Sequence, residues 1–258
     1  ARKIEGEKIF IALDADEIFT SNFTTTDDWQ KIVNAKAGDI FNFRWAWIGA
    51  DKKHCQIQQE GWSQWAFYDD GSEPELGKIH VARVPWPKKS TPREFFVTDF
   101  FVMHFPYVNV SREISKQKFY QCFIRITEKK WDNIVRLHRG YYRAGKVEYY
   151  KDEMPDYFFS EYKKLGIDIF SLLNLNEPYF WQDVRVLEYF EKYGIKHFQK
   201  LDIFDNEYLQ KLSKIAGYEI KDPRNFANKL LHFYLRKTQK YKHTFFIKNI
   251  DKVLKRLM

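Results

Sequence analysis

A short apolar run near the start of the chain ends abruptly in a cluster of carboxylates. Residues 9–13 read Ile-Phe-Ile-Ala-Leu, and Asp14-Ala15-Asp16-Glu17 follow directly. A continuous apolar run of this length is typical of a strand that is buried on both faces in an α/β sheet. Because residues two apart in an extended chain point to the same side, Asp14 and Asp16 are expected to lie together at the strand end. The pattern predicts an α/β fold with an acidic site at the sheet edge where such folds usually bind ligands.

Strand patterns occur in the first part of the chain and helical patterns in the rest. Further strands are expected at residues 40–48 and 95–104, with a short extended piece at 79–84 between turns, and a helix through Trp29 is expected to end at Gly38. Helices are expected at residues 112–125, 131–142, 158–165, 183–193, 205–216, 225–238 and 244–257. The sequence therefore predicts a mixed sheet over about residues 8–105 and a mostly helical C-terminal region, with domains at 1–110 and 111–258.

The positive charge of the chain is concentrated in its tail. The net charge is +8, and residues 191–258 hold 16 Lys and Arg against 7 Asp and Glu, which is more than the whole excess. Such a tail either meets an anionic partner or forms solvated helix faces. At the end of the chain Phe246, Ile250, Val253 and Leu257 recur at helical spacing beside lysines. This basic amphipathic helix either docks on the domain or lies on an anionic membrane surface.

Two cysteines, Cys55 and Cys122, are too few and too far apart for a disulfide framework or a thiolate metal site. This usage indicates a reducing compartment. No apolar stretch approaches the roughly 18 residues that a membrane span needs, and the N-terminus lacks the apolar run of a signal peptide. We therefore expect a cytoplasmic protein, with peripheral contact at the inner membrane face as the alternative for the tail.

The acidic segment resembles a known enzyme family. Residues 11–18, Ile-Ala-Leu-Asp-Ala-Asp-Glu-Ile, resemble the Asp-x-Asp segment of family-2 glycosyltransferases, and further short motifs follow in the order and rough spacing of bacterial members. These motifs are Trp45-Ala46-Trp47, Asp69-Asp70-Gly71-Ser72-Glu73, Gly77-Lys78-Ile79-His80 and Val102-Met103-His104. The resemblance covers about residues 1–125 well and the tail loosely. It implies a partial GT-A fold and an inverting, metal-dependent enzyme of polysaccharide biosynthesis.

The resemblance implies a nucleotide-sugar donor, a glycan or lipid-linked acceptor, and Mn²⁺ or Mg²⁺. A divalent cation offsets the charge that builds on the departing diphosphate, and hard oxygen ligands suit it. Asp14 and Asp16 are the expected metal or diphosphate ligands, with His104 as a third contact. Lys78 and His80 are expected to face a phosphate or the acceptor. The alternatives are a structural acidic turn for the aspartates and a core position for His104.

An inverting transferase also needs a carboxylate base near the incoming hydroxyl. Asp70 is the first candidate and Asp69 the substitute; the alternative is that both aspartates cap a turn. Four tryptophans lie between the two acidic segments, and an aromatic face stacks well on a sugar ring, although core packing is the commoner use of a tryptophan. These candidate acceptor-binding residues are Trp45, Trp47, Trp62 and Trp65.

The sequence departs from the family pattern at its start, and two other functions are alternatives to the transferase. Complete family members carry the nucleotide-binding half of the sheet before the Asp-x-Asp strand, whereas this sequence begins almost at the motif, so we expect a missing N-terminal segment. The rivals are a non-enzymatic carbohydrate-binding protein and a basic nucleic-acid-binding protein. Nucleic acid is disfavoured because the charge is confined to the tail and no standard binding motif occurs.

Overall fold

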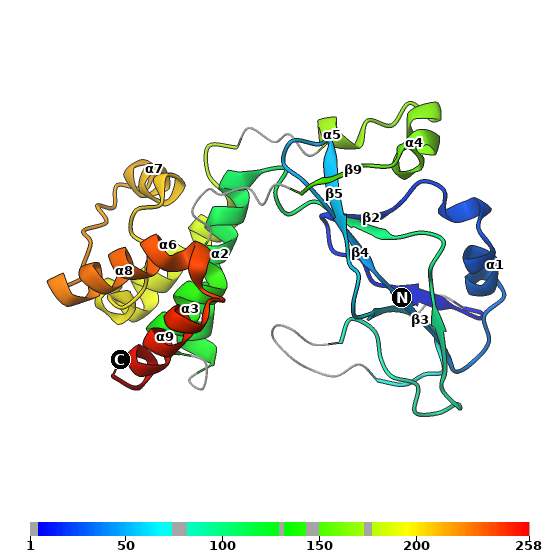
Figure 1. Ribbon diagram of the computed structural model, residues 1–258, viewed down its shortest axis with the longest axis horizontal. Helices are drawn as coiled ribbons and strands as arrows, with labels where there is room; N and C mark the ends of the chain where they lie inside the picture. The colour runs from blue at the N-terminus through cyan, green and yellow to red at the C-terminus, as the bar shows by residue number, and fades with distance from the viewer. Residues whose placement is uncertain (1–4, 74–81, 129–131, 143–149, 173–176, 258) are drawn as a thin grey trace. The chain divides into compact units, whose positions relative to one another are not determined.

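The computed structural model describes residues 5–73, 82–128, 132–142, 150–172 and 177–257 (Figure 1). The chain is a mixed α/β protein that divides into two compact units. Unit 1 comprises Ala1–Val108 and Val147–Asn174, and unit 2 comprises Asn109–Lys146 and Leu175–Met258. The division lies close to the predicted boundary at residue 110, but residues 147–174, which we had assigned to the helical region, belong to unit 1.

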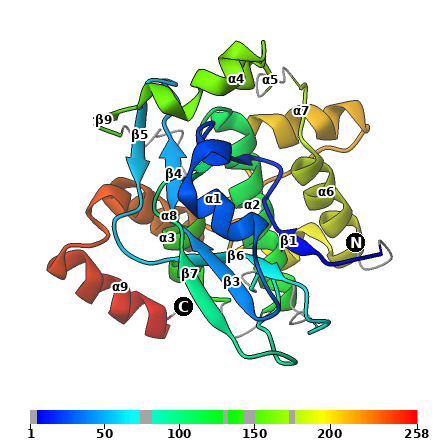
Figure 2. The same ribbon diagram turned by 90° about the vertical axis from the view of Figure 1, so that its right-hand side faces the viewer.

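Unit 1 contains two mixed sheets. The first has the order β1-β6-β3-β7, with β3 and β7 parallel and side by side (Figure 2). Its strands are β1 (Ile9–Ile11), β3 (Asp39–Phe43), β6 (Ser63–Tyr68) and β7 (Arg93–Phe96). The second sheet has the order β2-β8-β4-β5-β9, with β4 and β8 parallel. Its strands are β2 (Glu17–Phe19), β4 (Trp45–Ile48), β5 (His54–Ile57), β8 (Val102–His104) and β9 (Asp152–Glu153).

The opening strand differs from its prediction. Among the described residues β1 pairs only with β6, antiparallel, at the edge of its sheet. It is only partly buried, so the prediction of a strand buried on both faces is wrong. The single strand expected at 40–48 is two strands in different sheets, β3 and β4, with Arg44 between them. The strand expected at 95–104 is likewise β7 and β8. Apolar patterns reveal burial, but the sheet to which each piece belongs depends on distant partners.

Aromatic side chains fill the core beside the first sheet. Phe19, Phe43 and Phe100 contact one another, with ring centroids 5.1–5.7 Å apart. Trp65 is 1% exposed and lies 6.0 Å from the Phe43 ring. A second core surrounds Ala46, Ile48, Met103 and Phe158. Much of the aromatic content of the sequence thus serves packing.

Short helices complete unit 1. They are η1 (Phe23–Thr25), α1 (Asp27–Val33), η3 (Asp156–Phe158), α4 (Ser160–Lys164) and α5 (Ile169–Leu172). α1 begins where the Thr26 side chain accepts a hydrogen bond from the Trp29 backbone N–H. The segment with η3 and α4 is fastened to β2, because the Tyr162 hydroxyl donates to the Phe19 carbonyl at 2.9 Å.

Unit 2 is helical (Figure 1). Its helices are α2 (Val110–Thr127), α3 (Ile134–Tyr141), α6 (Trp181–Tyr193), η4 (Ile195–Phe198), α7 (Glu207–Ile215), α8 (Phe226–Thr238), η5 (Gln239–Tyr241) and α9 (Phe245–Leu257). Four of them begin after an asparagine whose side chain accepts a backbone N–H of the first turn. These caps are Asn109, Asn133, Asn206 and Asn225. Within the described residues, every strand except β9 precedes residue 110, and most of the helices follow it.

Buried charges join the helices of unit 2. The Asp202 carboxylate is fully buried and accepts from Arg224 at 2.6 Å and from Arg236 Nε at 2.7 Å. His138 Nε2 lies 3.2 Å from the same carboxylate. Among the described residues, no helix combines the length and apolar character that a membrane span requires.

Candidate functional site

The acidic segment forms a tight turn between β1 and β2. The Glu17 backbone N–H donates to the Asp14 carbonyl at 3.0 Å, and the Asp14 N–H donates to the Glu17 carboxylate at 2.9 Å. The prediction that residues 14–16 continue an extended strand is therefore wrong. The chain must turn here because β1 and β2 belong to different sheets.

Glu17 is the anchor of this turn. Its carboxylate is buried and accepts from Arg83 Nη2 at 2.9 Å, from a second Arg83 nitrogen, and from the Trp45 indole N–H at 3.0 Å. Burial raises the pKa of Glu17, but the hydrogen bonds from Arg83, the Asp14 backbone and Trp45 outweigh it, so the net pKa lies below the ordinary value. Glu17 is ionised at neutral pH and holds Arg83 in place.

Arg83 links the turn to the tryptophans. Its Nη2 donates to Asp14 at 2.8 Å, and its guanidinium lies over the Trp65 ring at 5.0 Å and the Trp45 ring at 5.8 Å. The Asp14 side chain is 61% exposed, so one of the two Asp-x-Asp carboxylates reaches solvent while paired with a cation. Burial lowers the pKa of Arg83, but the nearby carboxylates, chiefly Glu17, raise it by more. The net pKa lies above the ordinary value, so Arg83 stays charged.

Asp16 and His104 lie together at the ends of two paired strands. β2 and β8 pair antiparallel with Glu17 opposite His104, which brings the preceding Asp16 to the same edge. His104 Nε2 is 3.7 Å from the Asp16 carboxylate, which is too long for a hydrogen bond, and both side chains are largely buried. Neither ring nitrogen of His104 has a hydrogen-bond partner in the part of the chain that the structure describes.

The donor atoms of Asp16 and His104 suit a divalent cation, but they are only two. A carboxylate and an imidazole both bind Mn²⁺, and a buried imidazole without a partner is costly unless it meets a ligand. Among the described residues, however, no group of three or more His, Cys, Asp or Glu side chains is arranged to hold a metal ion. A metal at this edge would take its remaining ligands from a bound substrate or water.

Asp69 and Asp70 close a turn. Asp69 accepts from the Gly71 N–H at 3.0 Å, and Asp70 accepts from the Ser72 N–H at 2.9 Å and the Ser90 hydroxyl at 2.8 Å. Gly71 has a φ of +77°, a conformation that favours glycine. Burial raises the pKa of Asp70, but its hydrogen bonds hold the pKa well below the usual range. These are the contacts of the turn-capping alternative, and so low a pKa suits a general base poorly.

The four candidate tryptophans have different surroundings. Trp65 is a core residue, so its predicted contact with the acceptor is wrong. Trp45 and Trp47 are half-buried, with ring centroids 5.7 Å apart, and the Trp45 ring stacks on His104 at 5.8 Å. Trp62 is 37% exposed and lies under the Arg44 guanidinium.

The structure thus gathers Asp14, Asp16, His104 and Trp45 around Glu17 and Arg83. Sequence reasoning missed the roles of the last two: Glu17 stands inside the quoted motif and could have been found there, whereas nothing local marks Arg83. Two further candidates, Lys78 and His80, lie outside the described residues. A scan of protein-family models and searches of curated proteins and of solved structures found no match to this chain.

Proposed function

We propose that the chain is the catalytic-centre and acceptor-side part of a GT-A-like glycosyltransferase, which transfers a sugar from a nucleotide-sugar to an acceptor hydroxyl. The proposal depends on one observation: Asp16 and His104 meet at the edge of a mixed sheet, and the His104 nitrogens have no hydrogen-bond partner among the described residues. Buried polar atoms without partners are rare in folded proteins, and a bound ion or water is one explanation for them.

Asp16 and His104 would hold Mn²⁺ or Mg²⁺, which when bound offsets charge on the departing diphosphate. Magnesium and similar ions often take one or two protein ligands and complete their shell with substrate phosphates. Arg83, held by Glu17, supplies a fixed cation to the same edge and orients Asp14. The half-buried Trp47 and the exposed Trp62 are the candidates for contact with the acceptor.

No general base is assigned in this proposal. Asp70 and Asp69 serve the turn before β7, and the hydrogen bonds to Asp70 would have to break before it could accept a proton. Inversion therefore stands on the resemblance alone.

Calorimetric titration of the chain tests the proposal. The chain is titrated first with Mn²⁺, and then with UDP- and GDP-sugars in the presence and absence of Mn²⁺. We expect Asp16→Asn and His104→Gln each to weaken Mn²⁺ binding by at least about tenfold, since each removes one direct ligand. His54→Gln is the matched control, because His54 also contacts a carboxylate in unit 1, that of Asp51 at 2.6 Å. Absence of Mn²⁺-dependent sugar-nucleotide binding, or equal losses in the control, would refute the proposal.

A metal-independent carbohydrate-binding protein is the second candidate. Trp62 is 37% exposed and the Arg44 guanidinium lies over its ring at 4.9 Å, so a partly exposed aromatic ring and a hydrogen-bond donor stand together at the surface. Trp62→Ala would abolish glycan binding in this case, while Asp16→Asn would leave it unchanged. The opposite pattern supports the transferase.

A further inference from the structure

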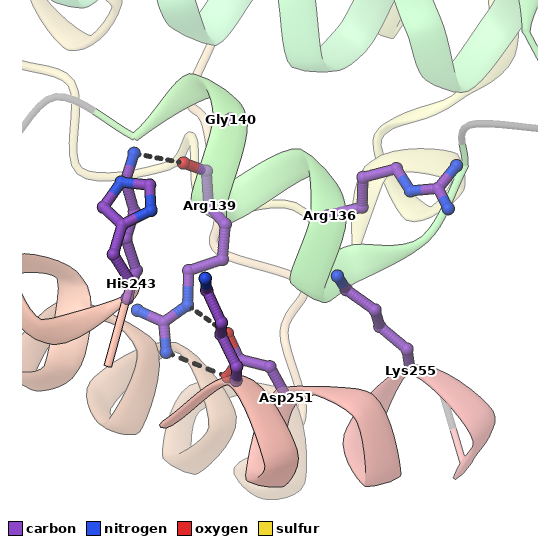
Figure 3. A pocket seen from close by; sticks show the side chains of 8 residues that line it. Arg136, Arg139, Gly140, His243, Asp251 and Lys255 are labelled. Atoms are coloured by element: carbon purple, nitrogen blue, oxygen red, sulfur yellow. Dashed lines mark hydrogen bonds and ion pairs between the residues drawn. The ribbon is translucent and has the colours of Figure 1, made fainter. Parts of the chain in front are cut away.

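A basic pocket in unit 2 has no role in the proposed sugar transfer. It has a volume of about 370 Å³ and opens between α3, the segment after η5, and α9 (Figure 3). The residues that line it are Arg136, Arg139, Gly140, Lys242, His243, Lys248, Asp251 and Lys255. Five of these eight residues are Lys or Arg, and one is an aspartate.

Arg139 and Asp251 form the structural floor of the pocket. Both are buried, and Arg139 donates to Asp251 through Nε at 2.7 Å and Nη2 at 3.0 Å (Figure 3). Arg139 also donates to the Leu235 carbonyl at 2.8 Å and to the Thr238 hydroxyl at 2.7 Å. This arginine is neutralised by its aspartate and fastens α3 to α8 and α9, so neither residue is available to a ligand.

The other cations in the lining come from three segments of unit 2. Arg136 comes from α3, Lys242 from the segment after η5, and Lys248 and Lys255 from α9. Figure 3 shows the Lys255 side chain reaching from α9 toward α3. Lys242 donates to the Arg139 carbonyl at 3.2 Å, and Figure 3 shows the Arg136 guanidinium turned away from Arg139 and Asp251. Asp251 is matched by Arg139, so Lys248 and Lys255 of α9 are the cations that would meet an anion in the cavity. Arg and Lys are the side chains that proteins use for phosphate.

Gly140 leaves one wall of the pocket open. Gly140 is exposed, and a Cβ atom built at this position meets no heavy atom within 4 Å. A side chain could therefore be added here without a clash in the folded chain.

We propose that this pocket binds a phosphate group, as a phosphomonoester or a diphosphate. The same chemistry could come from a soluble phosphate ester or from a phospholipid headgroup. Binding at this pocket is separate from the metal and donor binding proposed for unit 1.

The two sides of α9 favour the soluble source. Lys248 and Lys255 are seven residues apart and share one side of the helix, whereas the exposed Phe246 and Val253 each precede one of them by two residues. Residues two apart on an α-helix lie on nearly opposite sides. If the apolar side of α9 lay on a membrane, the pocket would face away from that membrane. The helix itself packs on unit 2 through Ile247, Asp251 and Leu254, so the docking alternative for the tail helix is correct for this side.

Calorimetric titration of the whole chain with inorganic phosphate and pyrophosphate at about 0.15 M ionic strength tests the proposal. Lys248→Ala with Lys255→Ala should weaken pyrophosphate binding by at least about tenfold, because two charge-assisted contacts are lost. The matched control is Lys252→Ala with Arg256→Ala, which removes two charges from the same helix outside the pocket. This control should change affinity by less than about twofold, since distant exposed charges are screened.

Gly140→Leu fills the pocket while keeping every charge. It should also weaken pyrophosphate binding, and circular dichroism of each variant checks that the helices persist. Sedimentation with phosphatidylcholine vesicles, with and without phosphatidylglycerol, identifies the source of the phosphate. If Lys248→Ala with Lys255→Ala loses binding to the phosphatidylglycerol vesicles and the control variant keeps it, the phosphate belongs to a lipid headgroup. The proposal is overturned if the wild-type chain binds neither pyrophosphate nor anionic vesicles, or if the pocket pair and the control pair lose affinity equally. Asp16→Asn should leave pyrophosphate binding at this pocket unchanged, which keeps the test independent of unit 1.

Discussion

Replacing Glu17 by glutamine tests whether the buried Glu17 carboxylate, and not the exposed Asp14, stabilises the acidic turn. The substitution keeps the shape of the side chain but removes its charge, and it presents an amide N–H₂ group to the donors of Arg83. In the native protein the buried carboxylate accepts from Arg83, Trp45 and the Asp14 backbone. Hydrogen bonds to a charged group contribute about 1.5–3 kcal/mol each when one partner is removed.

The loss is limited by what Arg83 retains. The Arg83 side chain is 22% exposed and still reaches Asp14 at 2.8 Å, so it is not left as an isolated buried charge. We therefore expect Glu17→Gln to lower the free energy of unfolding by about 2–3 kcal/mol, less than the ~3–5 kcal/mol for a broken, fully buried pair. Asp14→Asn, the matched control, should cost less than about 1 kcal/mol because that carboxylate is mostly exposed.

Urea denaturation at pH 7, followed by tryptophan fluorescence, measures both values. The pKa of Glu17 lies below its ordinary value of 4.5, so its stabilisation is present above that pH and is lost as the pH falls through the native pKa. The difference between wild type and Glu17→Gln should accordingly shrink in acid. If Glu17→Gln costs no more than Asp14→Asn at pH 7, the anchoring role of Glu17 is refuted.

Two further predictions concern the buried charges of unit 2. Asp202→Asn should lower the free energy of unfolding by about 3–5 kcal/mol in urea titrations, because Arg224 and Arg236 lose a fully buried counter-charge; a change below about 1 kcal/mol would contradict this. Burial lowers the pKa of His232 to about 4 against an ordinary 6.5, despite the opposing effect of Asp202. The unfolded chain therefore binds more protons in this range, and stability should fall by up to about 3 kcal/mol from pH 6.5 to 4. The melting temperature of His232→Gln should depend less steeply on pH, and an unchanged slope would count against the prediction.

The sequence predicts the class of the fold better than its pairings. Local signals such as Thr26 and Asn109 mark helix starts, and they depend only on a few neighbouring residues. Residues 9–13, in contrast, read as a central strand because apolar periodicity reports hydrophobic character and not the number of neighbouring strands. The place of this strand in its sheet depends on which distant strands pair with it in the folded chain.

The candidate site shows the same limit. The proximity of Asp16 and His104 follows from residues at strand ends, which the sequence could place. Arg83 could not be found because it is separated from Glu17 by 66 positions, and no local pattern encodes such a pair. As a sequence, Asp70 fits a base and a turn cap equally well, and only the hydrogen bonds that it accepts from Ser72, Lys89 and Ser90 distinguish the two roles.

The return of the chain to unit 1 after residue 146 sets an order on its assembly. Phe158 is fully buried in the second core, and the Ser21 hydroxyl donates to the Tyr157 carbonyl at 2.9 Å, so the sheets are completed by residues that follow much of α2 and α3 in the chain. During synthesis the ribosome delivers these residues late, and the earlier strands must wait with part of their apolar surface uncovered. A fragment cut at residue 110 would keep that surface open permanently and would be prone to aggregate.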